Sequence, residues 1–409
     1  MDDMLSPPTA RELRLGQDPA LPPAQRVDAR NWTLAPYNRW SFQRVQQFTR
    51  TARIPRAAQS APLTSNPQEF GSLVYEASAG QKISIDGMLR NTWADGFLVM
   101  HRGEVLTEQY FNGMEPDTLH LLMSCSKSIT STMLGIIAEE GLLDLSRPLT
   151  SYIPELEGTG MAGATLQQAL DMRVGVKFSE DYDDLDADWR QCELATGWRD
   201  PGPDYCGPTD IVGYMQTLIG SVGPHGDVFH YQSILTDALG VCLERATGRT
   251  FLDLFAERIW HPMGAEQDLV TIIDSAGTAV FEGGFNCCLR DFARFGRLIA
   301  AGGKAGGRQL VPKAWIDTCH TVDQDLLDAF AWGEHGEALP GFAYHNQWWV
   351  CDPQCAVIMA LGIHGQSLYL DLKRDFVVAK FSSQPAQANV AMVLDQMMGF
   401  EAIANRVCR

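Results

Sequence analysis

Apolar and polar positions predict a β-hairpin near each end of the chain. Residues 96–111, GFLVMHRGEVLTEQYF, form two β-rich runs around Arg102 and Gly103. Residues 366–383, QSLYLDLKRDFVVAKFSS, repeat this design with Lys373-Arg374-Asp375 at the turn. Short runs of β-branched and aromatic residues on both sides of a turn are typical of hairpins. We therefore expect one sheet that is assembled from distant parts of the chain.

Between the two hairpins, the spacing of apolar residues changes to the value near 3.6 that is typical of helices. Three segments share this spacing and have a glycine or proline close to their ends: 128–143, 234–248 and 250–264. A glycine just after a helix, such as Gly248, readily takes the left-handed conformation that ends it. Residues 388–407 show the same spacing and predict a closing helix. The fold class is therefore α/β, mixed α+β, with an antiparallel sheet flanked by helices and an inserted, mostly helical domain.

The order of these patterns divides the chain into three parts. Residues 1–70 are rich in Pro, Arg and Gln and carry scattered aromatic side chains, which need a surface to pack on. We expect them to form an arm on the main domain. Residues 71–130 and 311–409 are expected to form the α/β sheet domain, and residues 131–310 a helical domain that carries part of the active site.

The charge of the chain excludes several classes of partner. The formal net charge is -18 and the pI is about 4.9, whereas a nucleic-acid surface needs clustered Lys and Arg. An acidic membrane surface is disfavoured for the same reason. The first residues contain no apolar core of a secretory signal, and no stretch reaches the ~18 to 20 apolar residues of a membrane span. We predict a cytoplasmic protein that acts on a small molecule, with a homodimer as one open possibility for its assembly.

The ten cysteines are scattered, without a CxxC pair or a Cys/His spacing of the zinc type. Buried free thiols in a reducing compartment fit this distribution best. Cys351 and Cys355, in CDPQC, are close enough for a disulfide, and a tight turn between two strands explains them equally well. We expect neither a metal ion nor an organic cofactor.

The candidate chemistry begins at SCSK, residues 124–127, where a polar string turns into an apolar helical pattern. Ser124 and Lys127 suit a helix start, because Ser is a good N-cap and Lys a good helix former. They also suit a nucleophile and its base, since residues three apart are neighbours on a helix and an amine can take a hydroxyl proton. The helix N-terminus adds backbone N-H groups that can stabilise an oxyanion.

Two further stretches favour the catalytic interpretation. Tyr231, in HYQS, lies just before the predicted helix 234–248, where a phenol can act as a second acid or base. His364, Gly365 and Gln366 open a predicted strand, and the glycine permits a close approach of the backbone to a substrate. In the alternative, non-catalytic interpretation, Tyr231 is an aromatic residue at a domain boundary and the strand is an ordinary edge strand with a surface histidine.

Ser-x-x-Lys at a helix start, a Tyr motif about a hundred residues later and a His-Gly strand near the C-terminus occur in this order in the serine β-lactamase and penicillin-binding-protein superfamily. The chain resembles its class C-related branch, which includes family VIII carboxylesterases and 6-aminohexanoate-dimer (nylon-oligomer) hydrolases. The segments that carry the resemblance are SCSKS, NRWSFQRVQQ, GVKFSEDY and GGFNCCLRDFARFG. The likeness extends over about residues 30–405.

The resemblance implies a role for each matching residue. Ser124 corresponds to the acylated nucleophile, Lys127 to its base and Tyr231 to the Tyr of the Tyr-x-Asn motif. Tyr182 corresponds to an aromatic residue that closes over amide substrates, and Asn286 to a position beside the substrate. The Ser124 N-H and an N-H of His364-Gly365-Gln366-Ser367 are the implied oxyanion donors. A wall of the pocket without chemistry is the alternative for Tyr182 and Asn286.

Departures from the family pattern narrow the expected activity. Tyr231-Gln232-Ser233 lacks the Asn of Tyr-x-Asn, and His364-Gly365-Gln366 stands where penicillin-directed enzymes have Lys-Thr-Gly. A weak β-lactamase or D-Ala peptidase is therefore an alternative, and a serine hydrolase of small esters or amides is the main prediction. Aminohexanoate-type linear amides are one candidate substrate, and the long, acidic segment 178–206 is a candidate lid.

Competing classes have weaker support. The chain contains no G-x-S-x-G elbow and no HExxH motif. Cys125 is a conceivable nucleophile, but it would point about 100° away from Ser124 on a helix. A catalytically silent binding protein on the same fold is a further alternative, although Ser124, Lys127 and Tyr231 are all present.

Overall fold

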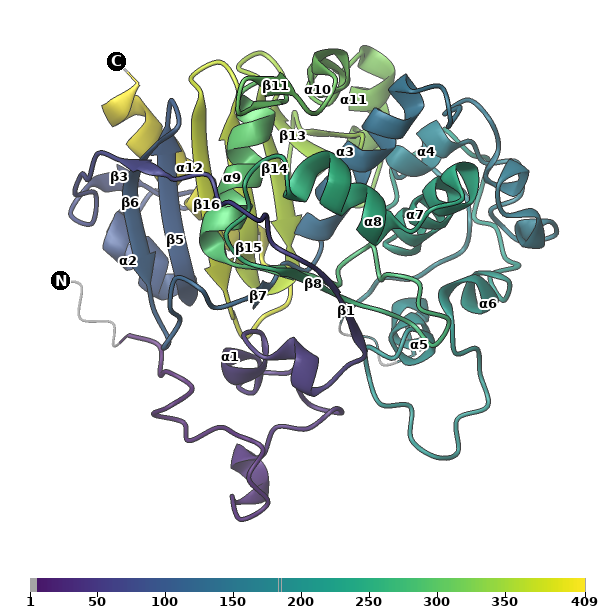
Figure 1. Cartoon of the computed structure of the whole chain (residues 1–409), viewed down its shortest axis with the longest axis horizontal. Helices are drawn as coiled ribbons and strands as arrows, with labels where there is room; N and C mark the ends of the chain where they lie inside the picture. Colours follow the sequence, from purple (N-terminus) through teal and green to yellow (C-terminus); the bar gives the residue numbers. More distant parts are fainter. Residues whose placement is uncertain (1–5, 183, 185, 409) are drawn as a thin grey trace.

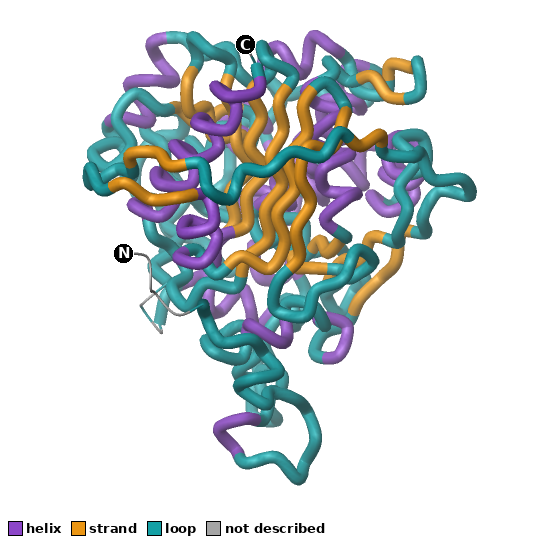
Figure 2. The backbone as a smooth tube through the Cα atoms, turned by 90° about the vertical axis from the view of Figure 1, so that its left-hand side faces the viewer, coloured by secondary structure: helices purple, strands orange, loops and turns teal. Residues whose placement is uncertain are grey.

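The computed structural model describes residues 6–182, 184 and 186–408. Its largest element is an eight-stranded sheet in the order β12-β13-β14-β15-β16-β5-β6-β2. Neighbouring strands are antiparallel except β2 and β6, which pair in parallel. Figure 2 shows the long strands side by side. The strands are β2 (Thr64–Ser65), β5 (Ala94–His101), β6 (Glu104–Tyr110), β12 (Ala343–His345), β13 (Trp348–Asp352), β14 (Val357–Gly362), β15 (Gln366–Asp371) and β16 (Phe376–Ser382).

The two predicted hairpins lie at the centre of this sheet. β5 and β6 form the first, with Arg102 and Gly103 at positive φ in the turn, and β15 and β16 form the second. β16 pairs with β5 from Phe376 opposite His101 to Lys380 opposite Phe97. The prediction of one sheet built from distant parts of the chain is therefore confirmed.

Helices α9 (Leu289–Ala300) and α12 (Val390–Val407) cover opposite faces of the sheet. Gly96 of β5 faces α9, because a Cβ at this position would lie 3.1 Å from a methyl carbon of Leu289. The next residue, Phe97, stacks on Phe400 of α12 with ring centroids 6.2 Å apart. Successive residues of a strand point to opposite faces. Both faces of β5 are therefore covered, which explains its nearly continuous apolar sequence.

The remaining helices gather beside the sheet (Figure 1). Helix α3 is the innermost of them, since every residue from Cys125 to Ile137 is buried. It packs against α7 and against β14, and α7 ends at Gly248 in the left-handed conformation, as predicted. These helices are α3 (Cys125–Glu139), α4 (Leu166–Leu170), α5 (Asp188–Ala195), α6 (Ile211–Met215), α7 (Ile234–Thr247), α8 (Phe251–Phe255), α10 (Lys313–Thr318) and α11 (Gln324–Ala331).

A four-stranded sheet in the order β1-β8-β9-β7 connects the parts of the molecule. Strand β1 comes from the expected N-terminal arm and pairs with β8, and β7 leads into α3. Helix α9 packs on β5, β15 and β16, so its residues lie with the large sheet. The sequence pattern had included them in the expected helical domain, residues 131–310. The strands are β1 (Thr51–Ile54), β7 (His120–Leu121), β8 (Leu269–Ile272) and β9 (Phe285–Cys287).

The segment that we expected to form an N-terminal arm makes buried contacts with the rest of the chain. Trp32 is 1% exposed, its indole N-H donates to the Trp198 carbonyl, and its ring lies 5.5 Å from that of Trp198. Arg39 and Asp95 form a buried ion pair of 2.7 Å. The smaller elements are α1 (Asn38–Ser41), α2 (Ile85–Asn91), β3 (Val74–Glu76), β4 (Lys82–Ser84), β10 (Lys304–Ala305) and β11 (Arg308–Gln309).

Two expectations about the chain as a whole concern membranes and thiols. Among the described residues, no helix has the length and apolar character needed to cross a bilayer. All ten cysteines carry free thiols, including Cys351 at the end region of β13 and Cys355 in the turn before β14. The CDPQC stretch is therefore a turn between two strands, without a disulfide.

Candidate active site

Ser124 lies at the first turn of α3, on a backbone that is shaped to present it. Met123, just before it, has φ of 49°, a left-handed conformation that is uncommon for a residue with a side chain. The Ser124 hydroxyl makes no capping hydrogen bond to its own helix. It is therefore available to groups outside the helix backbone. A strained backbone conformation, such as that of Met123, is common at functional sites.

Lys127 contacts this hydroxyl directly. Its Nζ donates to Ser124 Oγ over 2.8 Å and to the Glu282 carbonyl over 2.8 Å, and it lies 3.4 Å from Glu282 Oε2. The side chain is 1% exposed. The spacing of three residues on α3 brings the ammonium and the hydroxyl together, and Glu282 fixes the lysine from the opposite segment.

Tyr231, in the stretch just before α7, is the third residue beside Ser124 and Lys127. The Tyr231 ring lies 5.2 Å from Lys127 Nζ, and the Ser124 hydroxyl is close enough to the phenol to lower its pKa. The ring stacks on Trp349 of β13, with centroids 5.7 Å apart. Burial raises the pKa of Tyr231 well above its ordinary value, and the charge of Glu180 adds to this effect. The phenol therefore holds its proton in the resting site.

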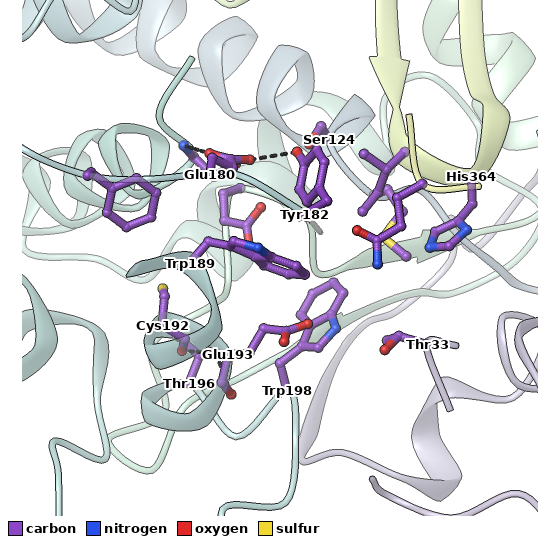
Figure 3. A pocket seen from close by; sticks show the side chains of 17 residues that line it. Thr33, Ser124, Glu180, Tyr182, Trp189, Cys192, Glu193, Thr196, Trp198 and His364 are labelled. Atoms are coloured by element: carbon purple, nitrogen blue, oxygen red, sulfur yellow. Dashed lines mark hydrogen bonds between the residues drawn. The ribbon is translucent and has the colours of Figure 1, made fainter. Parts of the chain in front are cut away.

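Glu180 is a half-buried carboxyl beside these residues that the motif analysis did not single out. It accepts hydrogen bonds from the Tyr182 hydroxyl (2.8 Å), the Ser233 backbone N-H (2.6 Å) and the Ser233 hydroxyl (2.5 Å). Burial raises its pKa to about 7. Figure 3 shows it beside Tyr182 and Ser124. Its place two residues before Tyr182, in the SEDY stretch, was the available signal.

Two more carboxylates, Glu282 and Glu193, line the same cavity as Ser124. Glu193 is buried and pairs with Arg190 Nη1 at 3.3 Å and Arg199 Nε at 3.1 Å. Burial raises the pKa of Glu193, and the two guanidinium groups oppose this effect. The charges of Arg190 and Arg199 are thus directed at a protein carboxylate.

Ser124 lies between two cavities. The inner one, about 40 Å³, is lined by Ser124, Glu180, Tyr182, Trp189, Glu193, Trp198 and His364, among others (Figure 3). The outer one, about 560 Å³, shares Ser124, Glu180 and Tyr182 and continues along Tyr231, Trp349 and the start of α12. The outer volume lies in the range of small-molecule sites.

Of the remaining residues implied by the family resemblance, some line the cavities and others do not. Tyr182 lines both cavities, next to Ser124. Asn286 lies in β9, is 3% exposed and donates to the carbonyls of Val270 and Gly284. It is not among the described residues that line either cavity. Glu282, four residues earlier, contacts Lys127 instead, because the chain enters the small sheet only after it.

The strand start 364–367 is also divided between the two cavities. His364, at φ 60°, lines the inner cavity, and Gly365 and Gln366 line the outer one. The His364 Nδ1 lies 2.7 Å from the Gln384 carbonyl, and burial lowers the pKa of His364 to about 4, so the ring is neutral at pH 7. Ser367 is 1% exposed and pairs with Lys380 within the sheet.

The segment just before this stretch lies close to the residues that precede Ser124. A Cβ at Gly362 would lie 2.7 Å from the Leu122 carbonyl oxygen and 2.9 Å from the Met123 Cβ. Ile363 lines both cavities together with Ser124. The glycine therefore lets the end of β14 lie against the chain that carries Ser124, which the His-Gly-Gln interpretation did not anticipate.

Cys125 does not share these features. It is fully buried, and burial raises the pKa of its thiol strongly. The thiolate form that a nucleophile needs is therefore suppressed. In the described part of the chain, no cluster of three or more His, Cys, Asp or Glu side chains could hold a metal ion.

The fold, the paired Ser124 and Lys127 and the adjoining Tyr231 define the class of serine hydrolases built on a β-lactamase fold. The family model described as Beta-lactamase matches residues 85–395. The chain belongs to the beta-lactamase family, and it is a hydrolase of the serine type.

Individual relatives refine this assignment. The 6-aminohexanoate-dimer hydrolase of Paenarthrobacter ureafaciens is 33% identical over 373 residues, which cover 90% of this chain and 92% of the relative. A solved structure from Bacillus anthracis, described as a 6-aminohexanoate-dimer hydrolase, is 29% identical with a TM-score of 0.86, over 95% of this chain and 99% of that one. A family VIII carboxylesterase shares the fold, with a TM-score of 0.56 and 18% identity over 77% and 92% of the chains.

Proposed function

We propose that this serine hydrolase cleaves small esters and linear amides through an acyl-enzyme at Ser124. The observation that carries the proposal is the 2.8 Å contact between Lys127 Nζ and Ser124 Oγ, with the Tyr231 ring 5.2 Å from the same Nζ. A serine hydroxyl becomes an effective nucleophile when a neighbouring base removes its proton. Lys127 and Tyr231 are buried, and the half-buried Ser124 lies at the junction of two cavities.

In the first half-reaction, Lys127 in its amine form accepts the Ser124 proton while Oγ attacks the substrate carbonyl carbon. The proton passes by way of Tyr231 to the leaving alcohol or amine, whose bond to the carbonyl carbon breaks. In the second half-reaction, a water molecule loses a proton to the same pair and attacks the acyl carbon. The bond from this carbon to Ser124 Oγ then breaks, the carboxylic acid leaves, and Oγ takes the proton back from the pair. A phenol that is protonated at rest suits this transfer.

Backbone N-H groups at the two edges of the site stabilise the oxyanion in this scheme. One is the N-H of Ser124 at the start of α3, where the helix dipole also favours negative charge. For the second oxyanion donor we propose an N-H of the segment Gly362–Ile363, in preference to the N-H groups of Gly365, Gln366 and Ser367. Its support is the close approach of Gly362 to Leu122 and Met123 and the place of Ile363 in both cavities.

The substrate class follows from the charges around the site. Glu180, Glu193 and Glu282 line the inner cavity, which disfavours an anionic group there. His364, which stands near the position of the family's fixed lysine, is neutral at pH 7 and offers no cation to a penicillin carboxylate. We therefore place esters and linear amides of the aminohexanoate type ahead of β-lactams and D-Ala peptides. A cytoplasmic location, which the ten free thiols support, belongs to the same proposal.

The experiment compares Ser124→Ala with the wild type on p-nitrophenyl esters, the linear 6-aminohexanoate dimer and nitrocefin. We expect kcat/KM for the esters and the dimer to fall by at least about a thousandfold, since removal of a triad-like nucleophile has effects of this size or larger. Nitrocefin should be a poor substrate for both proteins. Cys125→Ala is the matched control and should keep its activity.

A fluorophosphonate adduct identifies the nucleophile independently. Mass spectrometry of the labelled wild type should show one adduct on the peptide that contains Ser124, and none in Ser124→Ala. Full ester hydrolysis by Ser124→Ala, or an adduct on Cys125, would contradict the proposal. Absence of any hydrolysis in the wild type would favour the silent binding protein.

A further inference from the structure

The wall of the outer cavity that is formed by the chain after β16 is rich in carboxamide side chains. Gln384, Gln387, Asn389 and Gln396 all line this cavity, together with Gln366 at the start of β15. Apolar residues fill the spaces between them, among them Leu339, Trp349, Leu361, Ile363, Pro385, Val390 and Val393. Apolar surface with a few placed polar groups is the usual composition of a small-molecule site.

Three of these carboxamides have a buried polar atom without a partner among the described residues. They are Gln384 Nε2, Gln387 Oε1 and Gln396 Oε1. Gln384 is only 3% exposed and Gln396 only 2%. A buried donor or acceptor without a hydrogen bond costs about 1 to 3 kcal/mol, so native structures contain few of them.

Gln366 shows that the same wall can satisfy a carboxamide fully when its role is structural. Its Nε2 donates to the Ser382 carbonyl over 2.7 Å, and its Oε1 accepts from the Ser382 N-H over 3.0 Å. Gln396, by contrast, uses its Nε2 on the Met392 carbonyl of its own helix, and its Oε1 has no partner in the described part of the chain. The unsatisfied atoms are therefore a property of Gln384, Gln387 and Gln396 and not of the wall in general.

The backbone of the active-site strand is shaped around Gln384. A Cβ at position 365 would lie 2.4 Å from Gln384 Nε2, and Gly365 has φ of 91°, which residues with side chains rarely adopt. The His364 ring and Asn38 Nδ2 both hydrogen-bond the Gln384 carbonyl, at 2.7 and 3.0 Å. The carboxamide of Gln384 is thus held against the strand that borders Ser124.

The charges of the outer cavity indicate what kind of group it accepts. Neither lysine nor arginine occurs among the described residues that line it, so a carboxylate of a substrate would find no cationic partner there. Glu334 already accepts the Tyr231 N-H over 2.8 Å, and Glu180 has its three donors. Carboxamides can both donate and accept, which matches an uncharged amide.

We propose that the outer cavity is a subsite for a second, uncharged amide group of the substrate, which Gln384 and Gln396 recognise. The substrate class is then a linear chain with an amide beyond the scissile bond, such as an internal unit of an oligoamide or a capped dimer, and not a chain that places a free carboxylate in this cavity. The inference rests on the proposed function and specifies the substrate of the same centre.

The test measures binding without turnover, in the Ser124→Ala background, by titration calorimetry. Three ligands of similar length serve as probes: N-acetyl-6-aminohexanoic N-methylamide with two amides, N-methylnonanamide with one, and N-acetyl-6-aminohexanoate with a carboxylate. We expect the diamide to bind about three- to tenfold more tightly than the monoamide, the gain of one good hydrogen bond. The carboxylate should bind more weakly than the diamide.

Gln384→Met and Gln396→Met keep side-chain length and should each remove the preference for the diamide. Gln81→Met, at an exposed position, is the matched control and should preserve it. Gln387→Met replaces either variant that does not fold. A second readout is kcat/KM for p-nitrophenyl 6-acetamidohexanoate against p-nitrophenyl nonanoate, where the same variants should lose any preference for the amide.

An unchanged diamide preference in the Gln384 and Gln396 variants would overturn the subsite, as would a carboxylate that binds as tightly as the diamide. These outcomes are separate from the nucleophile assignment. Ser124-dependent hydrolysis without a glutamine effect refutes the subsite alone. Loss of the preference in the binding assay, with no Ser124-dependent hydrolysis, supports the subsite and refutes the proposed function.

Discussion

At the scale of single residues, burial is the strongest influence on the chemistry of this site. It keeps the Tyr231 phenol and the Cys125 thiol protonated, and it raises the pKa of Glu180 to about 7. The neighbouring hydroxyl Ser124 Oγ, the proposed nucleophile, is distinguished by its contact with Lys127 Nζ and not by its own acidity. The burial that suppresses the thiol therefore supports the serine as the reactive group of the proposal.

Glu180 makes stability depend on pH in a defined direction. Its pKa in the folded protein, about 7, lies above the ordinary value of 4.5, so the folded state binds the proton more tightly. This contribution to stability is fully present below about pH 4.5 and is lost as the pH rises to about 7. Glu180→Gln, which stays uncharged, should therefore gain up to ~3 kcal/mol relative to wild type between pH 5 and pH 8.

Urea unfolding of both proteins at pH 5 and pH 8 measures this gain. Other carboxyl groups titrate alike in the two proteins and cancel in the difference. Asp352→Asn, which alters a carboxylate outside the active site, serves as the control and should show a much smaller change. A difference between wild type and Glu180→Gln that is constant with pH would show that Glu180 is ionised in the folded protein at pH 5.

Tyr182 is the second residue whose role can be separated from that of the nucleophile. Its hydroxyl donates to Glu180 over 2.8 Å and its ring lies 5.2 Å from that of Trp189 at the edge of the inner cavity. Tyr182→Phe keeps the ring and removes the hydroxyl. We expect kcat/KM for amides to fall about tenfold or more and that for p-nitrophenyl esters to fall much less, because an amine leaving group depends more on positioned proton donors.

The measurement compares the linear dimer with a p-nitrophenyl ester on the same enzyme preparation. Trp189→Phe, which alters the neighbouring ring without touching the hydroxyl, serves as the comparison variant. Equal losses on both substrates in Tyr182→Phe would assign Tyr182 a structural role only.

At the scale of elements, close packing around α3 sets the position of Ser124, the proposed nucleophile. The helix is buried along almost its whole length, and Gly135 allows α10 to approach, since a Cβ there would lie 2.2 Å from the Trp315 ring. Gly240 plays the same part in α7, where a Cβ would lie 2.2 Å from the Phe281 ring. Helix α3, at whose start Ser124 lies, and helix α7, which follows Tyr231, are thus held by contacts that only glycine permits.

Gly135→Ala should therefore destabilise the protein, although alanine is the better helix former by about 1 kcal/mol. Overpacking of a well-filled core costs about 1 to 3 kcal/mol, and we expect the net loss in the free energy of unfolding to lie in this range. Urea denaturation measures it. Gly223→Ala, at a position where a Cβ meets no atom within 4 Å, is the control. A Gly135→Ala protein as stable as wild type would mean that Trp315 moves freely.

At the scale of the whole molecule, the acidic charge controls which substrates approach. The net charge of -18 repels anionic substrates, and dissolved salt screens this repulsion. We expect kcat/KM for an anionic ester, such as mono-p-nitrophenyl suberate, to rise severalfold between about 20 and 500 mM NaCl. Values for neutral p-nitrophenyl acetate should change little over this range. A fall for the anionic ester would indicate a local cationic site that overrides the net charge.

The large-scale arrangement was predictable where local patterns were strong. The two hairpins, the helix that ends at Gly248 and the closing helix α12 lie where periodicity placed them. Helix α9 was harder to assign, since its residues lie within a mostly helical stretch while its partners are β5, β15 and β16. Residue patterns show that a helix has an apolar face, and they do not show which surface that face covers.

The site shows the same division between local and distant information. Spacing on one helix brought Ser124 and Lys127 to attention, and their contact follows from helix geometry. Glu180 and Glu282 were missed because their importance arises from contacts with Ser233 and Lys127 across the fold. Asn286 was expected beside the substrate, and the structure places its side chain in the hydrogen bonds of the small sheet.

The sequence by itself determined the main elements, the placement of Ser124 and Lys127 on one turn of helix, and the acidic charge of the molecule. These features depend on neighbours within a few residues or on composition. Only the tertiary structure decided which carboxyl groups surround Ser124, which end of β14 approaches it, and that the glutamines after β16 face the outer cavity. Such features depend on distances between segments far apart in the chain, and those distances are fixed only when the whole core packs.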